Sequence, residues 1–131
     1  MSLPVTVRVE AVPNFLANLE AAHAFFIEQD AESATERFRK LKAKLRDMIA
    51  VMSWSPASGR PARFLTGRSV QARLRAEAVQ QLAAETGLPN LREYILGRHI
   101  VLYAHSETEV ALLALKHQRQ LEYSAKEIAV I

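Results

Sequence analysis

The chain has 131 residues, of which 50% are hydrophobic and 24% charged, with no cysteine and a formal net charge of +3. This length predicts a single domain over residues 1–131, and the lack of cysteine excludes disulfide scaffolds, cysteine-bound metal sites and thiol nucleophiles. The longest apolar run, Val110–Leu115, is far shorter than the roughly 18–20 residues of a membrane span, and no secretory signal pattern opens the sequence, so we expect a cytoplasmic protein.

The charges are distributed unevenly along the chain. Residues 37–75 hold eleven basic side chains and one acidic one, a net +10, which leaves −7 for the remainder. Such a block predicts a nucleic acid or an acidic protein as partner, although solvated helix faces produce the same pattern. The basic residues are Arg37, Arg39, Lys40, Lys42, Lys44, Arg46, Arg60, Arg63, Arg68, Arg73 and Arg75.

The first predicted elements are a strand and a helix. Residues 5–10 alternate strictly, so that Val5, Val7 and Val9 share one face of a half-buried strand. Pro13 and Asn14 end it. Apolar residues then follow a 3.6-residue spacing up to about Gln29, which predicts a first helix.

A second helix is predicted to begin after Asp30, a suitable N-cap, and to end near Trp54, before the breakers at residues 55–61. Its apolar positions step by four and three, which is typical of a helix that packs antiparallel on a neighbour. We therefore expect a helical hairpin. The apolar positions are Ala34, Phe38, Leu41, Leu45, Met48 and Met52.

Residues 61–89 form an insert in which Ser69 is a candidate cap for a third helix and Gly87 a candidate stop. Three short apolar segments follow, at residues 91–96, 99–104 and 110–115, separated by hairpin-length turns. The order β-α-α-(α)-β-β-β predicts an α+β fold whose helical hairpin covers one face of a sheet. The other face would be open to a partner.

Sequence signatures of common enzymes are missing. There is no zinc, nucleotide-binding or hydrolase motif, and the four histidines are scattered without metal-ligand spacing. We therefore expect no metal site and no cofactor, and isolated histidines of this kind usually serve structure.

The segment Lys116–Tyr123 carries the strongest chemical signal. It leaves the last predicted strand with a lysine, an imidazole, a guanidinium and a phenol within eight residues. Cleavage of RNA by its own 2′-hydroxyl requires a base, an acid and cationic stabilisation, which His117, Arg119 and Tyr123 are able to supply. A polar end to a strand is the alternative reading.

A second cationic set lies on the predicted sheet. Arg92 and Tyr94 alternate onto one face of their strand, and Arg98 lies at the following turn. An arginine beside an aromatic ring is a typical platform for nucleotides, although both are equally ordinary residues for the solvent face of a strand.

The order of these pieces resembles the RelE/ParE superfamily of bacterial type II toxins, which includes plasmid-stabilisation proteins. The matching segments are Pro56-Ala-Ser-Gly-Arg60, Leu91–Tyr94, Ile100–Ala104 and Leu113–Arg119. The likeness covers nearly the whole chain except about residues 62–88.

The resemblance implies a growth-inhibiting toxin that an adjacent antitoxin neutralises. RelE-like members cut mRNA on the ribosome, and on their pattern Arg119 and Tyr123 would occupy catalytic positions. ParE-like members poison DNA gyrase and lack that active set. Lys116 is the only lysine between Lys44 and Lys126, whereas a RelE-type nuclease is expected to have sheet lysines, so the ParE-like reading is favoured.

The leading hypothesis is thus a ParE-like toxin that binds a macromolecular target such as DNA gyrase and needs no turnover. An acidic antitoxin would enter the apolar seam between helices and sheet. One alternative is a ribosome-dependent mRNA endonuclease that uses His117, Arg119 and Tyr123. Another is a non-toxic interaction module, or a homodimer that pairs through the third helix, into which the insert has converted the fold. The expected target-binding residues are Arg60, Arg92, Tyr94, Arg98 and Lys116, with His117 and Arg119 beside them.

Overall fold

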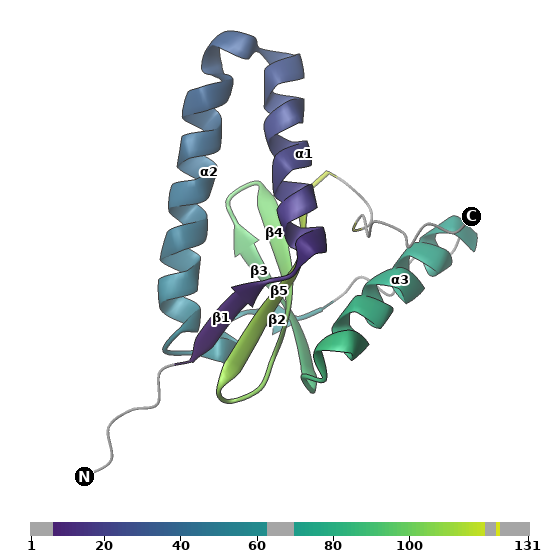
Figure 1. Ribbon diagram of the computed structural model, residues 1–131. Helices are drawn as coiled ribbons and strands as arrows, with labels where there is room; N and C mark the ends of the chain where they lie inside the picture. The colour runs from purple at the N-terminus through teal and green to yellow at the C-terminus, as the bar shows by residue number, and fades with distance from the viewer. Residues whose placement is uncertain (1–6, 63–69, 120–122, 124–131) are drawn as a thin grey trace.

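The computed structural model describes residues 7–62, 70–119 and 123, and its α+β architecture confirms the predicted fold class (Figure 1). A helical hairpin, a mixed sheet and a third helix form three layers. The elements are β1 (Arg8–Ala11), α1 (Pro13–Gln29), α2 (Ala31–Met52), the 3₁₀ turn η1 (Pro56–Ser58), β2 (Arg60–Pro61), α3 (Val70–Thr86), β3 (Asn90–Leu96), β4 (His99–His105) and β5 (Glu109–His117).

The five strands lie in the order β1-β5-β4-β3-β2. The opening strand pairs parallel with β5, and the remaining pairs are antiparallel. A register shift at Leu102/Tyr103 marks a bulge between β4 and β5. The turn between β3 and β4 contains Gly97, whose φ of +64° suits glycine.

The hairpin of α1 and α2 packs on one face of the sheet, as the spacing predicts. The Asp30 carboxylate accepts a hydrogen bond from the Glu32 backbone N–H at 3.1 Å, which caps α2. The seam of α2 is closed by the chain's own core rather than open to a partner: all its apolar positions are buried except Phe38, which is half-buried. The cluster joins Phe15, Phe26, Leu41, Leu45, Met48 and Met52 to Val101, Tyr103 and Leu112 of the strands.

The opposite face of the sheet is not fully open, which corrects the expectation of a bare surface. Helix α3 packs against β4 and β5 through Val79, which is only 1% exposed. Tyr123 joins the same cluster, together with Leu102 and Leu113. The insert therefore covers part of this face at β4 and β5, and Figure 1 shows α3 on the far side of the sheet from the hairpin.

Several boundaries differ from the expected ones. Helix α2 ends at Met52, and the described opening strand begins at Arg8. The proposed cap Ser69 and the first residues of the predicted strand, Val5 and Thr6, lie outside the described residues. In the part of the chain that the structure describes, none of the helices combines the length and the apolar character that crossing a membrane requires.

Candidate functional site

The residues that the sequence predicts for function fall into three places. Arg60, Lys116 and Tyr123 surround a carboxylate on the α3 side of the sheet. Arg92 and Tyr94 lie on the hairpin side of β3, against the hairpin core and the turn around Gly59. Arg98, His117 and Arg119 line a cleft beside α1, which Lys116 also reaches.

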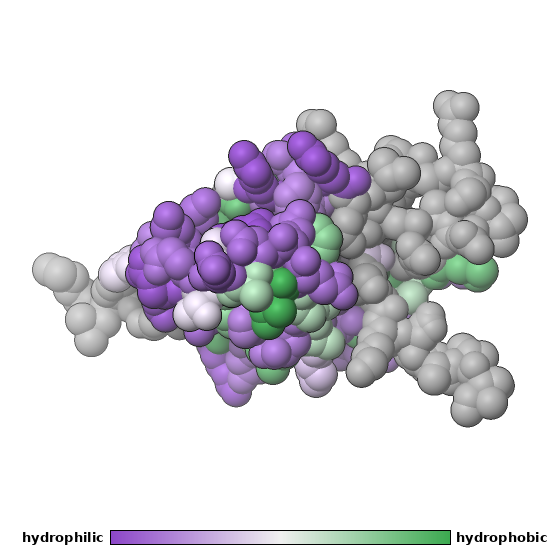
Figure 2. Space-filling view, turned by 90° about the horizontal axis from the view of Figure 1, so that it is seen from above, coloured by the Kyte–Doolittle hydropathy of each residue, from purple (hydrophilic) through white to green (hydrophobic). Residues whose placement is uncertain are grey.

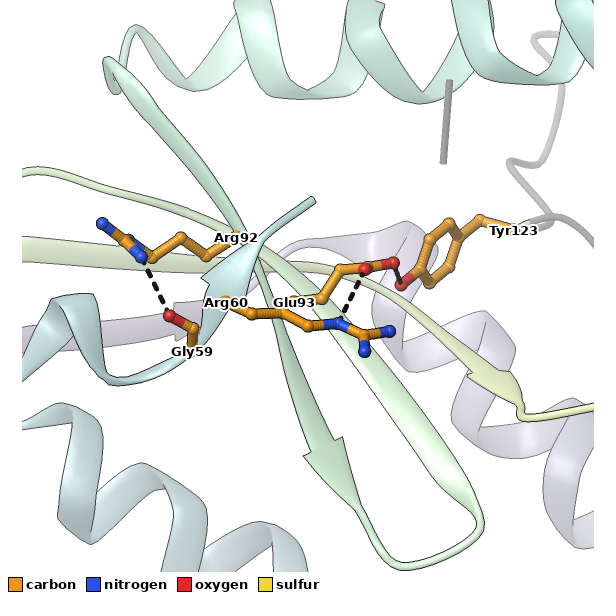
Figure 3. Close-up of polar contacts among 5 residues, drawn as sticks. All are labelled: Gly59, Arg60, Arg92, Glu93 and Tyr123. Carbon is orange, nitrogen blue, oxygen red and sulfur yellow. Dashed lines mark hydrogen bonds and ion pairs between the residues drawn. The ribbon is translucent and has the colours of Figure 1, made fainter. Parts of the chain in front are cut away.

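The first group is organised by Glu93, a β3 residue that the sequence reading overlooked (Figure 3). Its carboxylate is 3% exposed, lies 3.4 Å from the Arg60 Nε and accepts a hydrogen bond from the Tyr123 hydroxyl at 2.5 Å. The Lys116 ammonium lies 5.3 Å from the centre of the Tyr123 ring. A buried carboxylate needs such partners, so this cluster has an evident structural role.

Tyr123 is held in a form poorly suited to proton transfer. Burial, reinforced by the Glu93 carboxylate, raises the pKa of the Tyr123 hydroxyl far above its ordinary value. Its ring packs with Leu102 and Leu113 on the α3 side, whereas the His117 ring contacts His99 on the hairpin side. The structure therefore does not bring Tyr123 and His117 together.

The second group is tied to the turn before β2. Arg92 donates from Nη1 to the Gly59 carbonyl at 2.9 Å (Figure 3). It also donates from Nε to His105 Nε2 at 3.1 Å. Tyr94 is half-buried against the core beneath the hairpin. Arg92 therefore holds the β2–β3 edge, and Tyr94 has a role in the core.

The third group lines a cleft of about 690 Å³ between α1 and the end of β5. The α1 wall includes Asn18, Ala22, Phe25, Phe26 and Gln29, which share one helix face. None of the described lining residues is acidic. Four basic residues line the cleft as well: Arg37, Arg98, Lys116 and Arg119. This cleft is the strongest candidate for a binding site.

Two hydrogen bonds donated by backbone N–H groups hold the part of the cleft that carries Arg98 and Arg119. The Gln118 N–H donates to the Arg98 carbonyl at 2.7 Å, which fastens the chain after β5 to the β3–β4 turn. The Arg119 N–H donates to His117 Nδ1 at 3.1 Å, so the proton of a neutral His117 lies on Nε2. Arg98 and Arg119 are thus carried by neighbouring, hydrogen-bonded segments, and both side chains are exposed.

Two imidazoles lie in this cationic surrounding. The rings of His99 and His117 are 5.3 Å apart, and Phe26 contacts His99 edge-on. Burial, with smaller contributions from His117, Lys44 and Arg37, lowers the pKa of His99 to about 4. Burial and the neighbouring arginines also lower the pKa of His117. Both rings are therefore neutral near pH 7, and they bring hydrogen-bonding groups to the cleft without adding charge.

We expect His99 to make folding stability depend on pH. Because its folded pKa of about 4 lies below the unfolded value of 6.5, the unfolded chain binds the extra proton first. The stabilisation is complete above about pH 6.5 and is lost as the pH falls toward 4. Allowing for partial exposure, the loss is about 1–2 kcal/mol.

Urea unfolding of the wild type and of His99→Gln between pH 4.5 and pH 7.5 measures this effect. The wild type should lose more stability than the variant as the pH falls. His23→Gln, which removes an imidazole that stacks on Phe38, is the matched control and should keep the wild-type dependence. Parallel profiles for the wild type and His99→Gln would contradict the assignment.

Important members of these sites were missed from sequence alone. Glu93 lies between Arg92 and Tyr94, and strand alternation, which sends it to the opposite face, was the signal available for it. No motif or spacing in the sequence marks His99 or Phe25 as a member of a binding site. Among the described residues, no group of three or more His, Cys, Asp or Glu side chains is placed to hold a metal ion.

Comparison of the sequence with protein-family models and with curated proteins finds no match. Solved structures do match: a chain of the chromosomal ParDE TA system from P. aeruginosa aligns with a TM-score of 0.57 at 12% identity, over 86% of this chain and 96% of that one. A chain of the toxin-antitoxin complex RelBE2 from Mycobacterium tuberculosis aligns with a TM-score of 0.45 at 15% identity, over 92% and 100%. The ParDE similarity confirms, at the level of the fold, the RelE/ParE-like architecture that the sequence predicts.

Proposed function

We propose that this protein is the toxin of a type II toxin-antitoxin system, which inhibits growth by binding a macromolecular target such as DNA gyrase. The observation that carries the proposal is the fold shared with a chain of a ParDE TA system over 86% of this sequence. The cationic surface of α2 and of the cleft adds support, because both suit acidic partners.

The antitoxin is proposed to bind the outer face of α2. The seam beneath the hairpin is filled by the core, and α3 covers much of the other sheet face, so the exposed cations of α2 become the better receptor. Trp54, which is 78% exposed, lies just beyond the end of this helix and offers an aromatic anchor. The exposed cations are Arg39, Lys40, Lys42, Lys44 and Arg46.

Target contact is proposed for the rim of the cleft rather than for the whole predicted set. Arg98, His117 and Arg119 line the cleft; Lys116 lines it too, but its ammonium lies over the Tyr123 ring. Arg60 and Arg92, in contrast, contact Glu93 and Gly59, and Tyr94 packs on the core. We therefore assign these three residues to the architecture around the site.

Controlled expression tests the toxin assignment. Inducing the chain alone should arrest growth, and co-expression with the neighbouring gene, expected to encode a short acidic protein, should restore it. Trapped gyrase–DNA complexes after induction would support the proposed target, whereas mRNA cut at codon positions would identify an endonuclease instead. Normal growth in both arms would overturn the proposal.

Charge reversal on α2 tests the antitoxin surface. Arg46→Glu should weaken antitoxin binding by about tenfold or more, because it replaces an attraction by a repulsion at an exposed position. Arg8→Glu makes the same charge change on β1 and should leave the Kd within about twofold. Calorimetric titration with the purified antitoxin gives both values. Equal losses in the two variants would show that only net charge matters.

A further inference from the structure

The cleft beside α1 combines a closed floor with a charged rim. Phe26 at its base is 5% exposed, and the volume of about 690 Å³ lies within the range of small-molecule sites. The Arg37 guanidinium lies 4.2 Å from the centre of the Phe26 ring, which fixes it at the wall. This volume suits one compact ligand.

The charge of the lining points to a multiply charged anion. The guanidinium groups of Arg37, Arg98 and Arg119 line the cleft, and none of the described lining residues is acidic. A single carboxylate carries one negative charge, whereas a phosphate monoester carries about −1.5 to −2 near pH 7. The guanidinium groups of Arg98 and Arg119 provide the paired donors that phosphate oxygens prefer.

An aromatic surface lies in the same cleft. Phe25 lines it and is 48% exposed. Gln29, one turn further along α1, adds an exposed amide. Figure 2, which views the molecule from above, shows a mostly hydrophilic surface around a small hydrophobic area. One exposed ring beside one pair of arginines matches one base and one phosphate.

We propose that this cleft is a binding site for a single nucleotide, whose phosphate is held by Arg98 and Arg119 and whose base stacks on Phe25. The imidazoles of His99 and His117 line the same cleft and supply hydrogen bonds to the sugar or phosphate. This activity goes beyond the proposed toxin function and does not depend on growth inhibition.

Calorimetric titration of the full chain, made by cell-free synthesis, tests the proposal. The probes are adenosine 5′-monophosphate, adenosine and inorganic phosphate. The nucleotide should bind at least tenfold more tightly than adenosine, because only the nucleotide engages the arginines, and at least tenfold more tightly than phosphate, because only the nucleotide engages Phe25. Equal affinity for adenosine and its monophosphate would overturn the proposal.

Variants locate the site. Arg98→Gln and Arg119→Gln should each weaken nucleotide binding about tenfold, and Phe25→Ala should weaken it to a similar degree. All three side chains are exposed, so the variants should fold. Arg46→Gln, an equal charge loss on the outer face of α2, should leave the Kd within about twofold. If Arg46→Gln weakens nucleotide binding as much as the cleft variants do, the nucleotide responds only to the net charge of the protein, and the proposal is overturned.

Two competitors distinguish other occupants. A short acidic peptide that binds more tightly than the nucleotide, and loses affinity in Arg98→Gln, would make the cleft a protein-binding site and overturn the proposal. If adenosine 5′-monophosphate fails to displace a bound single-stranded oligonucleotide, the cleft is a nucleic-acid-binding site, and the proposal is overturned. Displacement of both competitors by the mononucleotide supports the single-nucleotide assignment.

Discussion

Gly59→Ala is expected to lower the free energy of unfolding by about 2–3 kcal/mol through overpacking alone. A Cβ at this position would lie 2.4 Å from the Glu93 carbonyl oxygen and 2.8 Å from the Tyr103 hydroxyl. Neither neighbour yields easily. The carbonyl belongs to β3, and the Tyr103 hydroxyl accepts from the Gly59 N–H and donates to the Pro56 carbonyl at 2.7 Å.

Gly87→Ala is the matched control, since its cost has a different origin. Gly87 has a φ of +70° and open space around it, so alanine there meets only backbone strain of about 1–2 kcal/mol. Urea unfolding of both variants measures the difference. If Gly59→Ala lowers the free energy of unfolding by no more than Gly87→Ala does, the turn around Gly59 relaxes to admit the methyl group. The close packing of Gly59 against β3 is then not essential for stability.

The sequence predicts the long elements of the fold because each carries a recognisable pattern. The four-and-three spacing of α2 reflects side chains that the hairpin-side core buries, whereas β4 and β5 are continuous apolar runs because both of their faces are buried. The helix cap at Asp30 follows from local chemistry alone. Strand β2 is different, because two residues carry no period and their pairing with Glu93 and Arg92 is a long-range contact.

The position of α3 was beyond prediction for a similar reason. Local signals such as Gly87 identify a helix in the insert but not the surface that it covers, and its contact through Val79 with β4 and β5 is a long-range one. The expectation of an open sheet face therefore failed because the insert supplies a second layer.

The sequence predicted some of the residues that line the candidate site, but neither all of them nor their arrangement. Lys116 and His117 are consecutive in a strand, so they point to opposite faces, one toward Tyr123 and the other toward His99. The alternation of side chains along a strand was enough to predict that these two residues lie on opposite faces. The cleft itself was not predictable, because it needs α1 and the end of β5, which are about ninety residues apart, to meet.

Tyr123→Phe is expected to destabilise the fold by about 1–3 kcal/mol, because it removes a hydrogen bond to the buried carboxylate of Glu93. Tyr123→Ala should cost more, about 3–5 kcal/mol, since the ring is 1% exposed and its loss leaves a cavity beside Leu102 and Leu113. Tyr94→Phe, which removes a hydroxyl on the other face of the sheet, is the control for the first variant.

A double-mutant cycle separates this structural role from catalysis. If the Tyr123 hydroxyl stabilises the fold through its hydrogen bond to Glu93, the effects of Tyr123→Phe and Glu93→Gln on the free energy of unfolding should be non-additive. The expected coupling is about 1 kcal/mol or more. Growth inhibition should then follow the fraction of folded protein in each variant. Loss of growth inhibition by orders of magnitude in Tyr123→Phe, at unchanged stability, would instead make Tyr123 a catalytic acid and require the tyrosine to leave its buried position in the active complex.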